Sequence, residues 1–202
     1  AFPVKFISYS FVEPLGKRFS TKALWIFEDA WTDFLWLTVF GIGSINNNFQ
    51  KKHIILPMMG IEEIFEMCIY GLRRVIPAEI SNESMDYCEW KNGYRTEGMT
   101  GVAKELARKL VGTLGASIKA FILSKIGYVE GAGYGNQTER TEYLLFMMCT
   151  LLPTVTSVFG LIPKFFYDLS GEKKERMYQE LAERRRSIIA QMNEINADDN
   201  DG

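Results

Sequence analysis

The chain of 202 residues is long enough for one domain of ordinary size, and its acidic and basic side chains nearly balance, at a net charge of −2. This balance argues against a nucleic-acid partner, because nucleic-acid binding requires a local excess of positive charge. A single histidine and three scattered cysteines argue against a zinc site or a disulfide scaffold. The chain also lacks a recognisable catalytic nucleophile with its base and a phosphate-binding glycine loop, so we expect neither an enzyme nor a resident cofactor.

Two apolar segments in the first half of the chain carry acids. The first covers residues 23–50 and ends in the uncharged run "FLWLTVFGIGSINNNFQ", and the second covers residues 53–77. An acid in the middle of a membrane helix costs about 2.5–3.5 kcal/mol. If the segments cross a membrane, we therefore expect their acids to face a protein interior or a water-filled cavity. Amphipathic helices of a soluble protein remain the alternative. The acids are Glu28, Asp29, Asp33, Glu62, Glu63 and Glu66.

The next feature is the dense polar stretch "DYCEWKNGYRTEG", residues 86–98, which we expect to connect two helices. Tyr87 and Trp90 are suited to anchoring a connection at a membrane interface. The four charged residues Asp86, Glu89, Arg95 and Glu97 can form hydrogen-bonded ion pairs. A solvated loop without any coupling role is the alternative.

Residues 100–129 form an amphipathic pattern when they are placed at 100° per residue. One half of this predicted helix carries Lys104, Arg108, Lys109 and Lys119 together with two glycines, and the other half is purely apolar. Glycines are unusual in a soluble surface helix, since each costs about 1 kcal/mol relative to alanine. The pattern favours a membrane helix with an apolar half facing lipid and a cationic half facing a cavity.

The clearest membrane signal lies at residues 143–163, "YLLFMMCTLLPTVTSVFGLIP", which are 21 residues without a charge. About 20 apolar residues suffice to cross a bilayer core. A buried core helix of a soluble protein is the alternative. After residue 170 the chain becomes highly charged and is expected to form an exposed or surface-docked helix. Its apolar residues recur at helical spacing, at Met177, Leu181, Ile188, Met192 and Ile195.

The connections between the predicted helices alternate in charge. Segments 15–22, 78–99 and the tail from residue 164 hold most of the lysines and arginines outside the helices, whereas the segment "EGAGYGNQTERT" at residues 130–141 is nearly free of bases. Basic loops accumulate on the cytoplasmic side of a membrane. We therefore expect the 78–99 connection and the C-terminus to be cytoplasmic.

These residues carry a resemblance to a known family. The pattern D-Y-x-E-W-K-x-G-x-R-x-E at residues 86–97, followed by Lys109 and the small-residue run "GTLGAS", resembles the glycoside/pentoside/hexuronide:cation symporters. This family is a branch of the major facilitator superfamily that includes the melibiose permease. The resemblance implies an all-α fold of twelve membrane helices in two halves of six.

The resemblance also implies how the chain is organised. Residues 1–168 would supply the end of helix eight and helices nine to twelve, and residues 169–202 would form a cytoplasmic tail with an amphipathic helix. The N-terminal half of the carrier, in which the family keeps the acids that bind the coupling cation, would be missing. The implied location is the inner (plasma) membrane, with several crossings.

Two site assignments follow from the resemblance. Asp86, Glu89, Arg95 and Glu97 correspond to a cytoplasmic gate that packs against the N-terminal half when the carrier faces outward. Lys109 corresponds to a lysine that reaches the central cavity near the sugar and the cation. The implied partners are a sugar, the lipid bilayer, the N-terminal half and a coupling cation, H⁺, Na⁺ or Li⁺.

We therefore expect one of two functions. The first is a fragment of a sugar:cation symporter that works by alternating access. The second is a soluble or peripheral α-helical interaction protein, in which the charged stripes are solvated faces.

Overall fold

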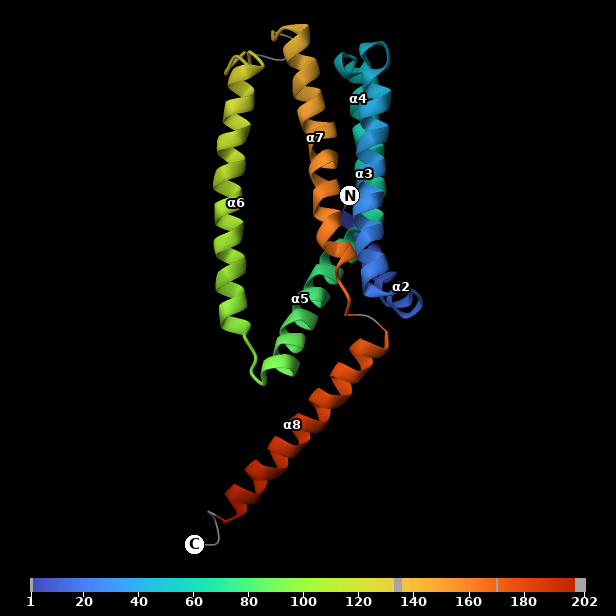
Figure 1. Cartoon of the computed structure of the whole chain (residues 1–202). Helices are drawn as coiled ribbons and strands as arrows, with labels where there is room; N and C mark the ends of the chain where they lie inside the picture. Colours follow the sequence, from blue (N-terminus) through green and yellow to red (C-terminus); the bar gives the residue numbers. More distant parts are fainter. Residues whose placement is uncertain (1, 133–135, 170, 199–202) are drawn as a thin grey trace.

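The structure is a computed structural model that describes residues 2–132, 136–169 and 171–198. Within these residues the secondary structure is entirely helical, as the sequence predicts, and the helices are connected by short segments (Figure 1). The elements are α1 (Phe2–Tyr9), α2 (Val12–Arg18), α3 (Thr21–Ser44), the 3-10 helix η1 (Ile45–Gln50), α4 (Lys52–Cys68), α5 (Tyr70–Asn92), α6 (Glu97–Lys125), α7 (Glu139–Phe165) and α8 (Glu172–Asp198).

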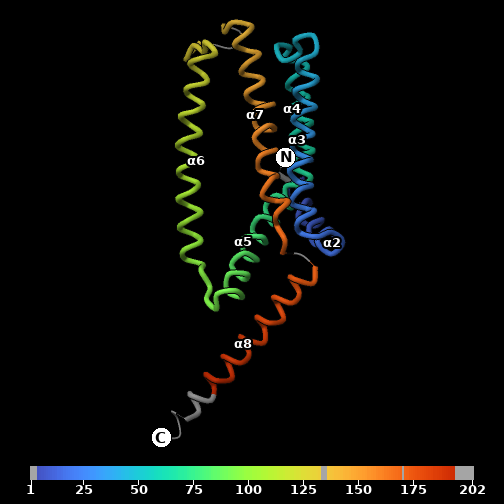
Figure 2. Tube along the Cα trace, in the orientation of Figure 1, coloured from blue at the N-terminus to red at the C-terminus, as the bar shows by residue number. Residues whose placement is uncertain are grey.

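Helix α3 is the centre of the packed part, where it contacts α4, α5 and α7. Its Gly43 allows a close approach to α7, because a Cβ at this position would lie 2.3 Å from Cζ of Phe146. The Phe146 ring stacks against Phe40 and Phe49, at centroid distances of 6.0 and 5.6 Å. Small residues permit this kind of close helix contact. Figure 2 shows α3, α4 and α7 running side by side.

The turn between α3 and α4 is formed by an asparagine run. Asn46 and Asn47 have positive φ angles of 51° and 54°, a conformation that asparagine tolerates better than most residues. Asn47 Nδ2 donates to Glu139 Oε1 at 2.8 Å, and Gln50 Nε2 donates to Glu142 Oε2 at 3.1 Å. The α3–α4 turn therefore lies beside the start of α7, at the opposite end of the molecule from α2 and α8 (Figure 1).

The extent of α5 corrects one sequence-based expectation. Residues 86–92 are the last two turns of α5, so that only residues 93–96 connect α5 to α6. The helix ends at Gly93, which has a φ of +81° and donates its N–H to the carbonyl of Glu89. Glycine is the usual residue for a left-handed helix cap. The charges of 86–92 therefore project from a rigid helix and not from a loop.

The acids of α3 and α4 are mostly removed from solvent, as expected. Glu28 and Glu62 are 5% and 6% exposed. Asp29 Oδ2 lies 2.6 Å from Nζ of Lys164 on α7, which itself is buried and lies 4.4 Å from the Trp25 ring centroid. Of the six acids on α3 and α4, only Glu63 is exposed.

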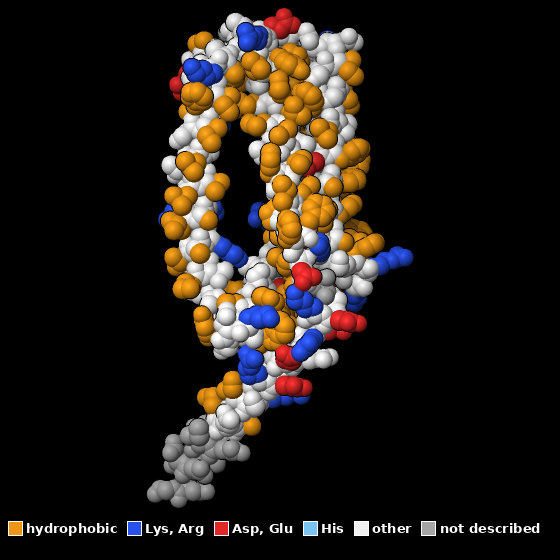
Figure 3. Space-filling view, viewed as in Figure 1, with side chains coloured by type: hydrophobic (Ala, Val, Ile, Leu, Met, Phe, Trp, Pro, Cys, Tyr) orange, Lys and Arg blue, Asp and Glu red, His pale blue; other side chains and the backbone are white. Residues whose placement is uncertain are grey.

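Helices α6 and α7 leave large apolar surfaces uncovered. Among the described helices, α7 is the one whose length and composition would allow it to cross a membrane, and only 11% of its apolar stretch is buried. Helix α6 buries no residue within the described chain, and Figure 3 shows an open space between it and the neighbouring helices. This exposure argues against α7 as the buried core helix of a soluble protein.

Candidate functional site

The α5–α6 hairpin brings four predicted gate residues together. Arg95 Nη1 lies 3.1 Å from Asp86 Oδ1 and 3.8 Å from Glu89 Oε2, and its Nε lies 2.5 Å from Glu97 Oε1. Asp86 and Glu89 are one helical turn apart, so their carboxylates lie on one face of α5. Both are largely buried, and Arg95 is about one-third exposed.

A second arginine, from the tail, shares the same two carboxylates. Arg185 Nη2 lies 2.6 Å from Glu89 Oε2 and 3.4 Å from Asp86 Oδ1, and its Nε donates to Glu89 Oε1 at 3.1 Å. The adjacent Arg184 donates to the Glu89 carbonyl at 3.2 Å. The two-point contact with Glu89 is the geometry in which arginine binds a carboxylate most strongly.

The arginines change the protonation chemistry of Glu89. The hydrogen bond from Arg185 holds the pKa of Glu89 below its usual value, and the positive charges of Arg185 and Arg95 add to this effect. The same contact raises the pKa of Arg185. Both carboxylates are thus within reach of both arginines.

A buried carboxylate on α5 forms a second link to the tail. Glu83 is almost completely buried and accepts hydrogen bonds from the Tyr167 hydroxyl and from Lys174 Nζ. Lys174 also lies 3.3 Å from Glu79 Oε1. Burial is the main reason why the pKa of Tyr167 is raised, and the hydrogen bond to Glu83 is the second. The Tyr167 hydroxyl therefore remains a donor.

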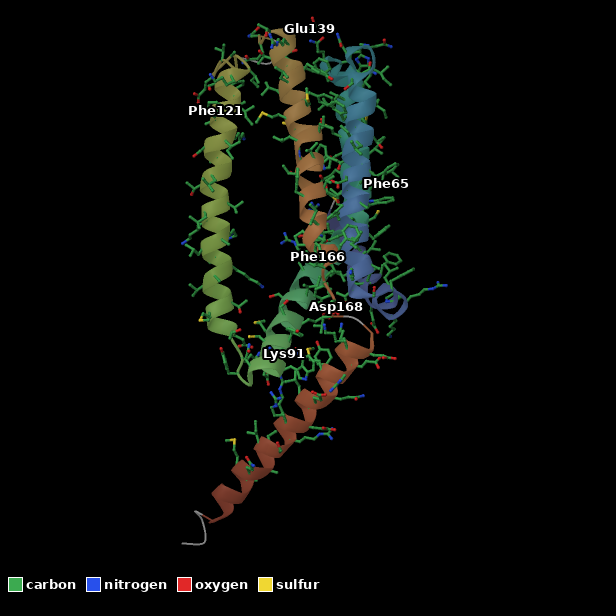
Figure 4. All side chains as sticks on the ribbon, viewed as in Figure 1. Phe65, Lys91, Phe121, Glu139, Phe166 and Asp168 are labelled. Atoms are coloured by element: carbon green, nitrogen blue, oxygen red, sulfur yellow. The ribbon has the colours of Figure 1, made fainter. Side chains whose placement is uncertain are left out.

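Apolar packing holds the first half of α8 against α5. Met177 and Leu181 are buried together with Leu169, against Tyr87 and Trp90. Trp90 Nε1 also donates to Glu180 Oε2 at 2.6 Å. We call this surface, formed by residues 79–90 of α5 and residues 167–185 of the tail, the α5–α8 junction. Figure 4 labels Lys91 at the end of α5 next to it.

The second half of α8 does not dock within the described chain. Ile188 and Met192 are exposed, and the side chain of Ile195 lies outside the described residues. The expected apolar stripe of the tail is therefore divided into a docked part and an exposed part.

Lys109 lies on α6, apart from the α5–α8 junction. Its side chain is 74% exposed, and its Nζ is 4.0 Å from Glu105 Oε1, a carboxylate that also pairs with Arg108 at 2.9 Å. Nothing lies within 4 Å of a Cβ built at Gly112 or Gly115. The polar half of α6 is connected to α5 through Lys104, which donates to Ser81. The structure leaves the space beside Lys109 open.

Arg185, Glu83 and Tyr167 were not predicted from the sequence as residues of this site. A signal for Arg185 was present, since it follows Leu181 by four residues and therefore lies on the docked face of the tail helix. Glu83 and Tyr167 are 84 residues apart, and no local pattern connects them.

The all-helical architecture, the uncovered apolar faces and a charged cluster at one end are typical of helical membrane proteins, a class that includes transporters. Comparison with known families agrees. The family described as MFS/sugar transport protein matches residues 2–171, and the chain belongs to this family. Membership favours the transporter over the helical interaction protein.

Individual relatives are distant. The chain is 27% identical over 106 residues to a proposed sulfoquinovose importer of Salmonella typhimurium, covering 52% of the chain and 22% of the relative. It is 25% identical over 118 residues to a glucuronide carrier protein homolog of Escherichia coli, covering 57% and 25%. It is 26% identical over 115 residues to the uncharacterized symporter YnaJ of Bacillus subtilis, covering 57% and 24%.

The chain thus spans about a quarter of the length of the curated relatives that it matches. No solved structure matches it significantly.

Proposed function

We propose that the chain is the C-terminal part of a sugar:cation symporter of the inner membrane that works by alternating access. Helix α1 would end helix eight of the carrier, α3 would be helix nine, α4 with α5 helix ten, α6 helix eleven and α7 helix twelve. Residues 1–168 would thus form the membrane part, and residues 169–202 the cytoplasmic tail. Family membership and the alternating placement of the connections support this assignment.

The observation that carries the proposal is the sharing of Asp86 and Glu89 by Arg95 and Arg185. A conformational switch requires contacts that differ between its states. Carboxylates with two alternative cationic partners fulfil this requirement, because one partner can be exchanged while charge balance is kept. The cluster would be the cytoplasmic gate, which closes against the N-terminal half when the carrier faces outward.

The missing partner of α6 would be the rest of the carrier. Among the described residues, α6 has none that is fully buried, and most helix stability in proteins comes from packing. The N-terminal half and the preceding helices would cover α6 and enclose its polar face. Lipid would cover its apolar half.

We further propose that the substrate is an anionic sugar derivative bound beside Lys109. The polar face of α6 carries Lys104, Arg108, Lys109 and Lys119 against two acids, Glu97 and Glu105. Such an excess of positive charge in a low-dielectric cavity favours a ligand with a carboxylate or a sulfonate. The names of two relatives refer to sugars of this kind, a glucuronide and sulfoquinovose.

The test uses the complete carrier, reconstituted into liposomes with a sodium, lithium or proton gradient. Accumulation of a radiolabelled glucuronide, in preference to a neutral glycoside, is expected under one of these gradients. Equal uptake of both sugars would contradict the anionic substrate, and no uptake under any gradient would contradict the symporter.

Membrane association is tested separately on the chain itself. We expect the expressed chain to sediment with membranes and to resist alkaline extraction. Recovery of a monodisperse protein without detergent would support the soluble interaction protein instead.

A further inference from the structure

A cluster of three acids on α4 lies outside the α5–α8 junction and away from Lys109. Glu62, Glu63 and Glu66 each place one carboxylate oxygen within 4.8 Å of an oxygen of the other two. Their spacing along α4 produces this grouping, since residues four apart share a helix face. Proximity of carboxylates alone does not identify a ligand.

The state of Glu62 supplies a second observation. Its side chain is among the most buried polar groups of the described chain, at 6% exposed, and its Oε1 has no hydrogen-bond partner there. A buried carboxylate has lost its hydration, and its charged form is stabilised only by a donor or a cation. Glu66 already has a partner, because it forms an ion pair with Arg73. Glu62 therefore lacks a counter-charge.

The nearby cations do not supply this counter-charge. Lys5, Arg73 and Arg74 line a pocket of about 490 Å³ together with Glu63 and Glu66. Arg73 pairs with Glu66, and Lys5 and Arg74 lie against the Tyr70 ring, at 5.0 and 5.4 Å from its centroid. In the part of the chain that the structure describes, neither Glu62 nor Glu63 forms an ion pair. The pocket borders Glu63 and Glu66, so a hydrated ion can reach the cluster from their side.

We propose that Glu62, Glu63 and Glu66 bind a hard cation of the size of Na⁺ or Ca²⁺. Oxygens within 4.8 Å of one another can surround such an ion, since Ca²⁺ takes oxygen ligands at about 2.3–2.6 Å. Glu62 supplies the buried ligand, Glu63 the exposed and movable one, and water from the pocket completes the coordination. Because Arg73 neutralises Glu66, the cation balances the two remaining charges.

This proposal does not depend on the proposed transport function, because it concerns binding to the chain itself. It also places a cation on α4, whereas the family resemblance places the coupling cation on acids of the N-terminal half. The site would be an additional one.

The experiment measures cation binding by isothermal titration calorimetry. The chain is purified in detergent, in buffer with choline as the only other cation, and titrated with NaCl or with CaCl₂. We expect saturable binding of one ion. Glu62→Gln and Glu63→Gln should each weaken it at least about tenfold, since the number of charged ligands sets cation affinity. Glu13→Gln, in an exposed ion pair with Lys17, is the matched control and should bind as the wild type does.

A fourth variant separates binding from a merely structural role. Arg73→Gln releases Glu66 as a full ligand and should strengthen binding, although it breaks an ion pair. Circular dichroism checks that all variants retain their helix content. Saturation by only one of the two salts identifies the ion. No saturable binding of either, or unchanged binding in Glu62→Gln, would overturn the proposal, and neither result depends on sugar transport.

Discussion

Arg185 of the tail and Glu89 of α5 are 96 residues apart in sequence, yet Arg185 Nη2 lies 2.6 Å from Glu89 Oε2. The same oxygen lies 3.8 Å from Nη1 of Arg95. The tail and the α5–α6 hairpin thus share the Glu89 carboxylate. A movement of either arginine changes the electrostatic environment of the other.

The first prediction concerns this cluster in the complete carrier. The double variant Asp86→Asn, Arg95→Gln should slow sugar transport while expression remains near the wild-type level, because it removes contacts made chiefly in one state. Breaking such pairs costs roughly 1 kcal/mol if they are exposed and more if they are desolvated. Initial uptake rates are the measurement. The pair Glu13→Gln, Lys17→Gln removes an exposed ion pair of 2.5 Å as a control. Transport at the normal rate in the Asp86/Arg95 variant would mean that the hairpin is only a connection.

The second prediction is a loosening of the tail in acid. The pKa of Glu89 is lowered in the folded chain, mainly by Arg185, so its stabilising contact is complete above the ordinary glutamate pKa of about 4.3 and is lost as the pH falls through the lowered value. The pKa of Glu180 is lowered in the same direction, first by Arg176 and then by Trp90. The distance between spin labels at Tyr94 and Ala190 should therefore increase below pH 4.3. Glu89→Gln should reduce this increase in distance. An increase as large as in the wild type would argue against the Arg185 contact.

The third prediction concerns the apolar part of the α5–α8 junction. Leu181 is 1% exposed, and Leu→Ala at a buried position costs about 2–5 kcal/mol. Leu181→Ala should detach the tail and increase its rate of limited proteolysis. Ile188→Ala, in the exposed half of the same helix, should change stability by less than about 0.5 kcal/mol. Equal proteolysis of the two variants would mean that α8 does not dock in solution.

The fourth prediction tests topology. In a background without the three native cysteines, a cysteine at Glu130 should react with an impermeant maleimide added to intact cells, and a cysteine at Asn92 should react only after lysis. The reason is that the two residues lie at opposite ends of α6, which spans 29 residues from Glu97 to Lys125. Reversed labelling would invert the proposed orientation.

The fifth prediction concerns Lys109 in the complete carrier. Lys109→Ala should abolish sugar accumulation against a gradient, because its charge would be lost from the cavity. Lys104→Ala should be milder, since Lys104 lies nearer the start of α6 and donates to Ser81. Sugar affinity and cation dependence are measured alongside accumulation. If Lys109→Ala behaves like the wild type, Lys109 has no role in the cavity. Its ion pair with Glu105 would then be its remaining contribution, and such a pair stabilises a helix by about 0.3–0.5 kcal/mol.

Local patterns in the sequence were sufficient for much of the fold. The uncharged run 143–163 predicted α7, and the period of residues 100–129 predicted α6. The ion pairs of Arg95 with Asp86, Glu89 and Glu97 were also predictable, since all four residues lie within twelve positions. The extension of α5 to Asn92 was missed because polar residues suggest a loop, whereas the helix continues until Gly93 allows the left-handed turn.

The partners of the tail were decided by the tertiary structure alone. The sequence determined that α8 is amphipathic, but its apolar residues recur from Met177 to Met192 and do not indicate where docking stops. Burial of Met177 and Leu181 against Tyr87 and Trp90 places Arg185 over Glu89, while Ile188, three residues further along α8, stays exposed. Helix formation depends on residues a few positions apart, whereas docking depends on where distant helices end in space.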